Sequence, residues 1–287
     1  MSSTAGSNGR APAPGAPAAD PLAPLAVLPG VPEAVDSVRS SVDRVYGHRI
    51  MRRRSSEVSA EAALRGARAS AAVEGADWAL EEVRRRSDFG TEDEARTVGA
   101  ALRVTAEAGQ LLDIWQQSPL RVLARLHLVA ASGAAPDDSV GRPRRPGEPV
   151  EGPEIGLELP GADEVAARLD GLAQLVTGTT SVPALVLAAV VHGELQTLCP
   201  FGSCNGAVAR AAERIVLVGS GLDPKAICPA EVGHAELGRD AYRAALSGYA
   251  SGTPEGMTAW ITHCGRAVEL GVRESTAVCE AMQRGAA

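Results

Sequence analysis

Hydrophobic side chains recur at three- and four-residue intervals along most of this chain, which is the spacing of one face of an α-helix. From about residue 32, this spacing predicts a helix that buries Val35, Val38, Val42 and Val45. Further helices are predicted at residues 56–74, 77–86 and 91–115, from residue 119 onwards, and at residues 163–176, 183–198, 206–218, 231–249 and 257–273. The predicted fold class is therefore mainly α.

Proline and glycine interrupt this helical pattern in two segments. Residues 1–31 are rich in Ala, Pro, Gly and Ser, and this composition predicts a disordered tail. Residues 132–162 form a second Gly- and Pro-rich stretch, which predicts a long loop. Within it, residues 154–159 alternate between polar and apolar side chains, as one short strand does. We divide the chain into a tail (1–31), an N-terminal helical region (32–118), a helical core (119–275) and a C-terminal tail (276–287).

Charge and composition argue against nucleic acid and membranes as partners. The net charge of −7 over 287 residues does not supply the concentrated basic surface that holds a nucleic acid. Aromatic residues make up only 3% of the chain, which leaves little for stacking on bases. The basic runs at residues 52–54 and 84–86 are more typical of a solvated helix face or a partner contact. The longest apolar run, residues 182–191, is too short to cross a bilayer.

The cysteines indicate a reducing compartment. The chain has five, an odd number, and it is large enough to build its own core without disulfides. We therefore expect free thiols. The N-terminus lacks a basic segment followed by an uninterrupted apolar stretch, so no secretory signal is apparent. Together these features predict a cytoplasmic protein.

No metal site is predicted. A zinc site built from Cys199, Cys204, Cys228 and His234 is not favoured, because only the first pair has a spacing that zinc sites use. His192 ends an apolar helix, and we interpret it as a hydrogen-bonded histidine of the core rather than as a ligand or a base.

The most informative segment is residues 199–210, Cys-Pro-Phe-Gly-Ser-Cys-Asn-Gly-Ala-Val-Ala-Arg. It resembles the signature of the Fic (Fido) family, His-Pro-Phe-x-Asp/Glu-Gly-Asn-Gly-Arg-x-x-Arg. Five positions match the signature: Pro200, Phe201, Asn205, Gly206 and Arg210. Four positions differ: Cys199 replaces the histidine, Ser203 the acid, Cys204 a glycine and Ala207 the first arginine.

Segments outside the motif extend the resemblance over roughly residues 45–275. Residues 182–195 are similar to the apolar helix that leads into the family signature, and residues 242–246 and 258–261 resemble the last core helices. Residues 70–75 match the Ser/Thr-x-x-x-Glu-Gly/Asn motif of an inhibitory helix, through Ser70, Glu74 and Gly75. The resemblance implies a Fic-type helical core with an N-terminal helical extension and a short β-hairpin flap, to which residues 154–159 would contribute a strand.

The resemblance also implies an adenylyltransferase-like chemistry that this chain is poorly equipped to perform. In active relatives the histidine takes a proton from a target hydroxyl, which then attacks the α-phosphate of ATP while magnesium bridges the phosphates. Cys199 is the candidate catalytic residue only because it stands at the position of the histidine. An ordinary thiol has a pKa of about 8.5, so it mostly keeps its proton at neutral pH and is a poor base. Ser203 offers no anionic oxygen, so magnesium is not expected. Cys204 would be strained if the loop requires a positive φ.

ATP therefore remains the candidate ligand, with Asn205, Gly206 and Arg210 as candidate nucleotide-binding residues. Asn205 can alternatively cap the following helix, and the two roles are compatible. Glu74 is expected to pair with Arg210, as in relatives that carry the inhibitory helix. Because the catalytic base is missing, we interpret this pair as a structural link between the N-terminal helix and the core.

Three functions stay open at this point. The chain is a Fic-fold pseudoenzyme that binds a nucleotide or a protein partner, a divergent transferase of AMP or another phosphate-containing group, or an interaction protein with no nucleotide site. The sequence assigns neither the partner nor the oligomeric state.

Overall fold

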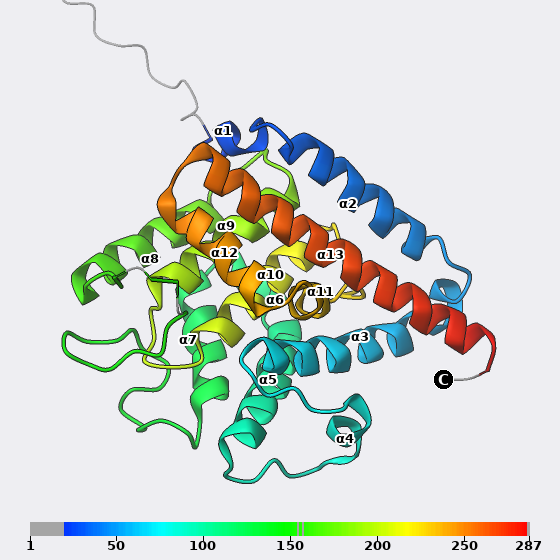
Figure 1. Cartoon of the computed structure of the whole chain (residues 1–287), viewed down its shortest axis with the longest axis horizontal. Helices are drawn as coiled ribbons and strands as arrows, with labels where there is room; N and C mark the ends of the chain where they lie inside the picture. The colour runs from blue at the N-terminus through cyan, green and yellow to red at the C-terminus, as the bar shows by residue number, and fades with distance from the viewer. Residues whose placement is uncertain (1–19, 154, 157, 286–287) are drawn as a thin grey trace, which may run out of the picture.

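The computed structural model describes residues 20–153, 155–156 and 158–285, and these residues form helices and loops without a strand (Figure 1). The predicted mainly α class is confirmed. The helices are α1 (Ala23–Ala26), α2 (Val31–Tyr46), α3 (Met51–Val73), α4 (Leu80–Arg85), α5 (Asp93–Gln110), α6 (Leu112–Trp115), α7 (Pro119–Ala131), α8 (Ala162–Thr177), α9 (Ala184–Leu198), α10 (Asn205–Gly219), α11 (Ala230–Leu237), α12 (Arg239–Ser251) and α13 (Pro254–Gln283).

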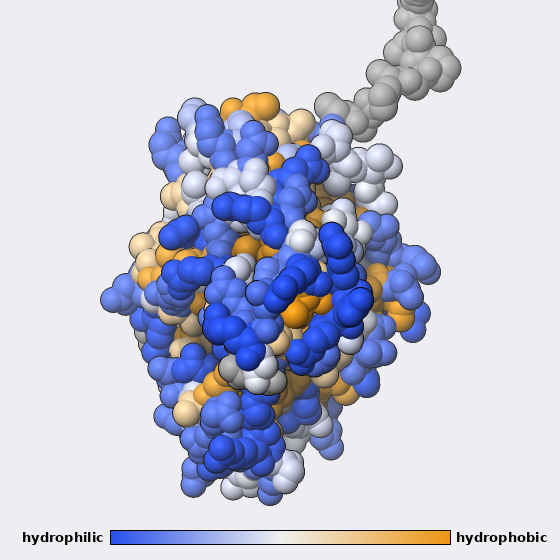
Figure 2. All heavy atoms as spheres, turned by 90° about the vertical axis from the view of Figure 1, so that its right-hand side faces the viewer, coloured by the Kyte–Doolittle hydropathy of each residue, from blue (hydrophilic) through white to orange (hydrophobic). Residues whose placement is uncertain are grey.

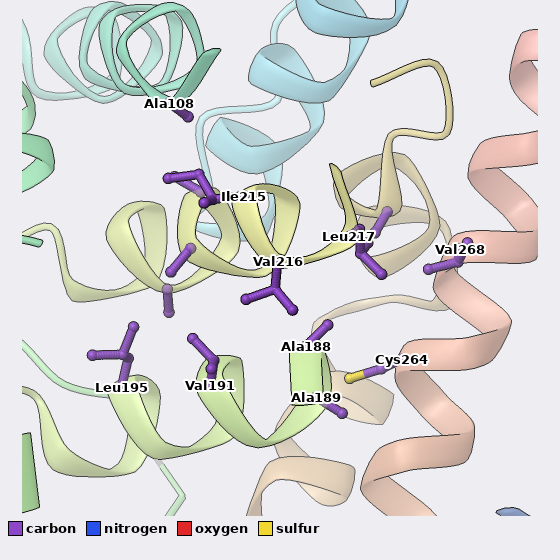
Figure 3. Packing of buried hydrophobic residues seen from close by; sticks show 14 of the residues in the cluster. Ala108, Ala188, Ala189, Val191, Leu195, Ile215, Val216, Leu217, Cys264 and Val268 are labelled. Atoms are coloured by element: carbon purple, nitrogen blue, oxygen red, sulfur yellow. The ribbon is translucent and has the colours of Figure 1, made fainter. Parts of the chain in front are cut away.

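Helices α9 and α10 form the centre of the molecule. Nearly every side chain of α9 is buried, which agrees with its continuous apolar sequence. Figure 3 shows Val191 and Leu195 of α9 pointing toward α10, from which Val216 points back. Small residues let other helices approach closely: a Cβ on Gly233 of α11 would overlap the backbone of α13 at Ala267. The core is thus a set of helices held at short separations around α9 and α10.

The N-terminal helices cover this centre from two sides. Helix α2 runs alongside the long helix α13, and α3 packs against α5 and α11 (Figure 1). Helix α3 ends at Val73, and its last turn lies next to the start of α10. This arrangement brings the segment that resembles an inhibitory motif to the motif loop.

Several predicted boundaries are wrong. Residues 1–19 of the expected disordered tail lie outside the described residues, but residues 20–31 are ordered because Leu22 and Val31 are buried. The expected C-terminal tail is helical as far as Gln283, where Met282 is still buried. The helix predicted at 231–249 is divided at Gly238, whose φ is 90°.

The predicted strand at residues 154–159 is not formed by the described part of that segment, and Glu154 and Leu157 lie outside the described residues. None of the described helices is both long and apolar enough to traverse a bilayer. On the face drawn in Figure 2, polar side chains dominate and apolar ones show only as small areas between them.

Candidate functional site

The loop between α9 and α10 carries the motif residues, and two of its positions have left-handed backbone. Cys199 has φ 43° and Cys204 has φ 57°. Such values favour glycine, so the strain expected from a cysteine at 204 is confirmed. Arg144 stabilises the loop from outside, since its backbone N–H donates to Pro200 O at 2.8 Å and its Nε donates to Cys199 O at 2.9 Å.

Asn205 ties this loop together rather than capping α10. Its Oδ1 accepts from the backbone N–H of Phe201 at 3.0 Å, and its Nδ2 donates to Phe201 O at 2.8 Å and to Glu151 O at 3.1 Å. The helix N-cap is Cys204, which makes no side-chain capping bond. The prediction that Asn205 caps the helix is therefore wrong. Both hydrogens of its amide nitrogen are therefore engaged by the loop.

Cys199 does not face a substrate. The residue is completely buried, and its Sγ donates to Gln196 O at 3.1 Å. Burial raises the pKa of this thiol to about 12, with only a partial opposing effect from the guanidinium of Arg144. A thiol that keeps its proton at neutral pH cannot remove one from a hydroxyl.

The predicted pair of Glu74 and Arg210 is confirmed. Arg210 Nη2 lies 2.6 Å from Glu74 Oε1, and Ser70 holds the same guanidinium through its Oγ at 2.9 Å and its carbonyl oxygen at 3.1 Å. The two halves differ in burial: the Arg210 side chain is 1% exposed and that of Glu74 is 43% exposed. The interpretation of this pair as a buried structural link therefore holds for Arg210 and Ser70. It does not hold for Glu74, because α3 ends at Val73 and leaves the Glu74 side chain partly exposed to solvent.

The Glu74 carboxylate also lies against the first turn of α10. A Cβ on Gly206 would overlap Glu74 Oε1, so only glycine leaves room for the carboxylate there. The backbone N–H groups at a helix N-terminus attract anions. Gly75 follows with φ 106°, the left-handed conformation that commonly terminates a helix. The Ser70–Gly75 segment therefore positions a carboxylate where an anionic ligand would bind.

A cavity of about 320 Å³ opens beside this carboxylate. The end of α3, helix α5, the start of α10, helix α12 and the segment at Glu151 form its walls. Its surface combines apolar groups such as Ala100 and Ala101 with two arginines of α12, Arg239 and Arg243. These two arginines were not predicted as site residues from the sequence, although their spacing of four residues places them on the same face of one helix.

Comparison with known proteins shows which fold carries this site. No protein-family model matches the sequence, and no curated protein matches it. Solved structures do match. A Fic family protein from Desulfovibrio desulfuricans G20 is similar with a TM-score of 0.68 at 20% identity, over 85% of this chain and 74% of that one. Fic-1 from C. elegans is similar with a TM-score of 0.61 at 16% identity, over 88% and 73% of the two chains. A Fic domain containing signaling protein from Bacteroides thetaiotaomicron has a TM-score of 0.59 at 12% identity, over 86% and 98%.

This chain has the Fic fold. Residues 199–210, whose resemblance to the family signature implied this fold, form the loop before α10 and the start of that helix. Ser203 in this loop is half-buried and offers only a hydroxyl. The described carboxylates that line the cavity are those of Glu74 and Glu151, and Glu74 is already paired with Arg210. The motif residues of this Fic-fold protein do not fit magnesium, which requires anionic oxygen ligands.

His192 is a buried, hydrogen-bonded histidine of the core, as predicted. Its Nε2 lies 2.7 Å from the hydroxyl of Tyr242, and its Nδ1 lies 2.8 Å from Oε2 of Glu213. Burial lowers the pKa of His192 below its ordinary value. Burial opposes the ionisation of Glu213, yet its histidine neighbours outweigh this effect and hold its pKa below the ordinary value.

The zinc set weighed from the sequence does not assemble in the described residues. Cys199, Cys204 and Cys228 do not join His234 in one group of ligand atoms. His234 instead places its Nε2 3.0 Å from Glu213 Oε2.

Proposed function

We propose that this Fic-fold protein is a pseudoenzyme that binds a nucleotide through its phosphates and does not transfer any part of it. The observation that carries the proposal is the position of Cys199, whose thiol is buried, protonated and bonded to Gln196 O. The position of the signature histidine therefore supplies no base to the cavity beside the motif.

Charge stabilisation is deficient as well. Attack of a hydroxyl on an α-phosphate with release of pyrophosphate requires cationic groups around the transferring and leaving phosphates. Ala207 stands where the signature has an arginine, and Ser203 stands where it has a metal-binding acid. The base, the metal-binding acid and the first arginine are thus all replaced at one site. Because such groups act as a unit, their joint replacement argues that the transfer step is lost rather than slow.

Binding is better supported than transfer. A cavity of about 320 Å³ is within the size range of small-ligand sites. Its apolar walls suit a ring system, and Arg239, Arg243 and the N-terminus of α10 suit an anionic group. Arg210 itself does not line this cavity, because its guanidinium is buried and held by Ser70 and Glu74. Glu74 competes with a phosphate for this place, so we expect weak binding by the wild type.

The cysteines bear on where the protein works. All five are free thiols, and four of them are buried. Free thiols suit a reducing compartment, which supports the proposal of a cytoplasmic protein.

The proposal is tested by thermal shift with ATP, with and without magnesium, followed by incubation with labelled ATP and a lysate. We expect stabilisation by ATP without covalent label on this chain or on any lysate protein. Arg239→Ala should reduce the shift, whereas Arg273→Ala, a surface arginine paired with Glu236, should leave it unchanged. Magnesium-dependent labelling that Cys199→Ala abolishes would establish a divergent transferase instead. Absence of any ATP shift, in the wild type and in Glu74→Ala alike, would leave an interaction protein without a nucleotide site.

A further inference from the structure

Four side chains from four helices converge in the core. They are His192 of α9, Glu213 of α10, His234 of α11 and Cys264 of α13, and one ligand atom of each lies within 4.8 Å of the others. All four side chains are buried, with exposures of 1% or less. We propose that this cluster is a structural zinc site that joins the four helices.

The ligand atoms lie close enough together to converge on a single ion. With zinc–nitrogen and zinc–oxygen distances of about 2.0–2.2 Å and a zinc–sulfur distance of about 2.3 Å, neighbouring ligand atoms are separated by roughly 3.3–3.8 Å. Glu213 Oε2 lies 2.8 Å from His192 Nδ1 and 3.0 Å from His234 Nε2. Each of these two distances must increase by about half an ångström to make room for the ion. Small changes in the side-chain torsions provide this increase.

One buried polar atom of the cluster, Oε1 of Glu213, also lacks a hydrogen-bond partner within the described residues. Buried polar atoms are nearly always satisfied by protein, water or an ion. This atom belongs to a proposed ligand, and a cation at the centre of the cluster would take up its charge.

The charge balance favours a divalent cation. Without one, the carboxyl group of Glu213 is buried in a site that is closed to water, where an anion is costly unless a counter-charge accompanies it. Binding of Zn²⁺ releases the Cys264 Sγ proton to solvent, so that two anionic ligands neutralise the ion. No electron is transferred, and the products are a zinc thiolate and one proton.

The imidazole protons have acceptors when the metal binds. A nitrogen that ligates zinc carries no proton, so with zinc bound the proton of each ring would lie on the other nitrogen. His192 Nε2 then donates to the Tyr242 hydroxyl at 2.7 Å, and His234 Nδ1 donates to His263 Nε2 at 3.3 Å. Zinc-bound histidines usually have such a partner on their second nitrogen. Tyr242 also lines the cavity, so the site would fix one wall of the proposed nucleotide pocket.

The donor set selects zinc over the other common divalent ions. Two imidazoles, one carboxylate and one thiolate are typical zinc ligands, whereas Mg²⁺ and Ca²⁺ prefer oxygen throughout. With four protein ligands and no exposed surface, the centre has no place for a substrate, which is the pattern of a structural site. The sequence analysis predicted no metal, because each ligand stands alone on its helix and none forms a short-spaced pair.

The test uses the full chain, unfolded in guanidinium and refolded with zinc or with EDTA. Refolding with zinc should give about one bound zinc per chain and a higher melting temperature than refolding with EDTA. Refolding with Co²⁺ should give the d–d absorption of a tetrahedral site together with a thiolate charge-transfer band.

Two cysteine variants assign the ligand. Cys264→Ser should lose the charge-transfer band, while Cys279→Ser, which removes another buried thiol of the same helix, should keep it. Wild type that refolds with zinc but retains none, and melts at the same temperature in EDTA, would overturn the proposal even if the variants fail to fold. A cobalt band that survives Cys264→Ser would overturn the assignment of the thiolate. Neither result would depend on whether ATP binds.

Discussion

Replacement of Glu74 by alanine separates the two roles that a carboxylate at this position can have. If the Glu74–Arg210 pair holds α3 to the core, the variant should be strongly destabilised. If the carboxylate instead covers an anion site, the variant should bind ATP more tightly with little loss of stability. The exposure of the Glu74 side chain, 43% against 1% for Arg210, leads us to expect the second outcome.

The expected loss of stability follows from that asymmetry. An exposed ion pair contributes about 0–1 kcal/mol, and breaking a fully buried pair costs about 3–5 kcal/mol. Arg210 keeps two hydrogen bonds to Ser70 in the variant, and solvent reaches the vacated place. We therefore expect a loss of about 1–2 kcal/mol, which lowers the melting temperature of a chain of this size by about 3–6 °C.

The expected gain in binding comes from removing one negative charge from the phosphate position. Two unit charges about 4 Å apart interact by about 4 kcal/mol at the effective dielectric of a protein surface. Solvent screening at a half-exposed carboxylate reduces this repulsion to about 1–2 kcal/mol, or roughly a tenfold tighter Kd for ATP. Glu74→Gln, which keeps the shape and removes the charge, should give most of this gain.

Isothermal titration with ATP and denaturant unfolding measure both quantities on the same samples. Glu57→Ala is the matched control, because Glu57 lies on α3, is 51% exposed and pairs with Arg54 far from the cavity. It should leave ATP binding unchanged. A loss of more than about 3 kcal/mol in Glu74→Ala, with no gain in ATP affinity, would refute the reasoning and restore the structural interpretation.

Two further predictions concern the motif loop. Because the folded protein keeps the Cys199 proton up to a pKa of about 12 while the unfolded thiol loses it near about pH 8.5, stability falls with rising pH in between. Between about pH 9 and pH 11, wild type should lose about 1.4 kcal/mol more per pH unit than Cys199→Ala in denaturant unfolding; parallel profiles would contradict the buried thiol. Cys199→His alone should remain inactive with labelled ATP, and weak transfer should need three further changes, Ser203→Asp, Cys204→Gly and Ala207→Arg. Full activity of the single variant would show that the phosphate and metal positions are less damaged than we infer.

The helical content could be predicted because each helix has a periodic or continuous apolar face, but the helix ends could not. The periodic pattern continues across Gly238, so a single helix was predicted where the backbone turns with φ 90°. Likewise α13 extends to Gln283 because Cys279 and Met282 are buried against other helices. Such contacts between distant segments decide where a helix ends, and local sequence does not record them.

The site shows the same division between local and distant causes. The left-handed backbone at Cys204 could be predicted, because the motif has glycine there and the need is local. The pairing of Glu74 with Arg210 could be predicted from the resemblance, but not the exposure of Glu74, which depends on where α3 ends. The four-helix cluster around Glu213 had no signal in the sequence at all, since its members meet only through the packing of α9, α10, α11 and α13.

The motif residues that this chain retains do not all support a ligand equally. Asn205 is explained by the loop that it braces, and Arg210 by its hydrogen bonds to Ser70; both would be needed in a protein that binds nothing. Gly206 has no such explanation in the loop, because a side chain there would meet the carboxylate of Glu74 and the guanidinium of Arg210. The case for an anion site therefore depends on Gly206, Glu74 and the cavity beside them. Resemblance to the motif by itself shows only that the loop has kept its shape.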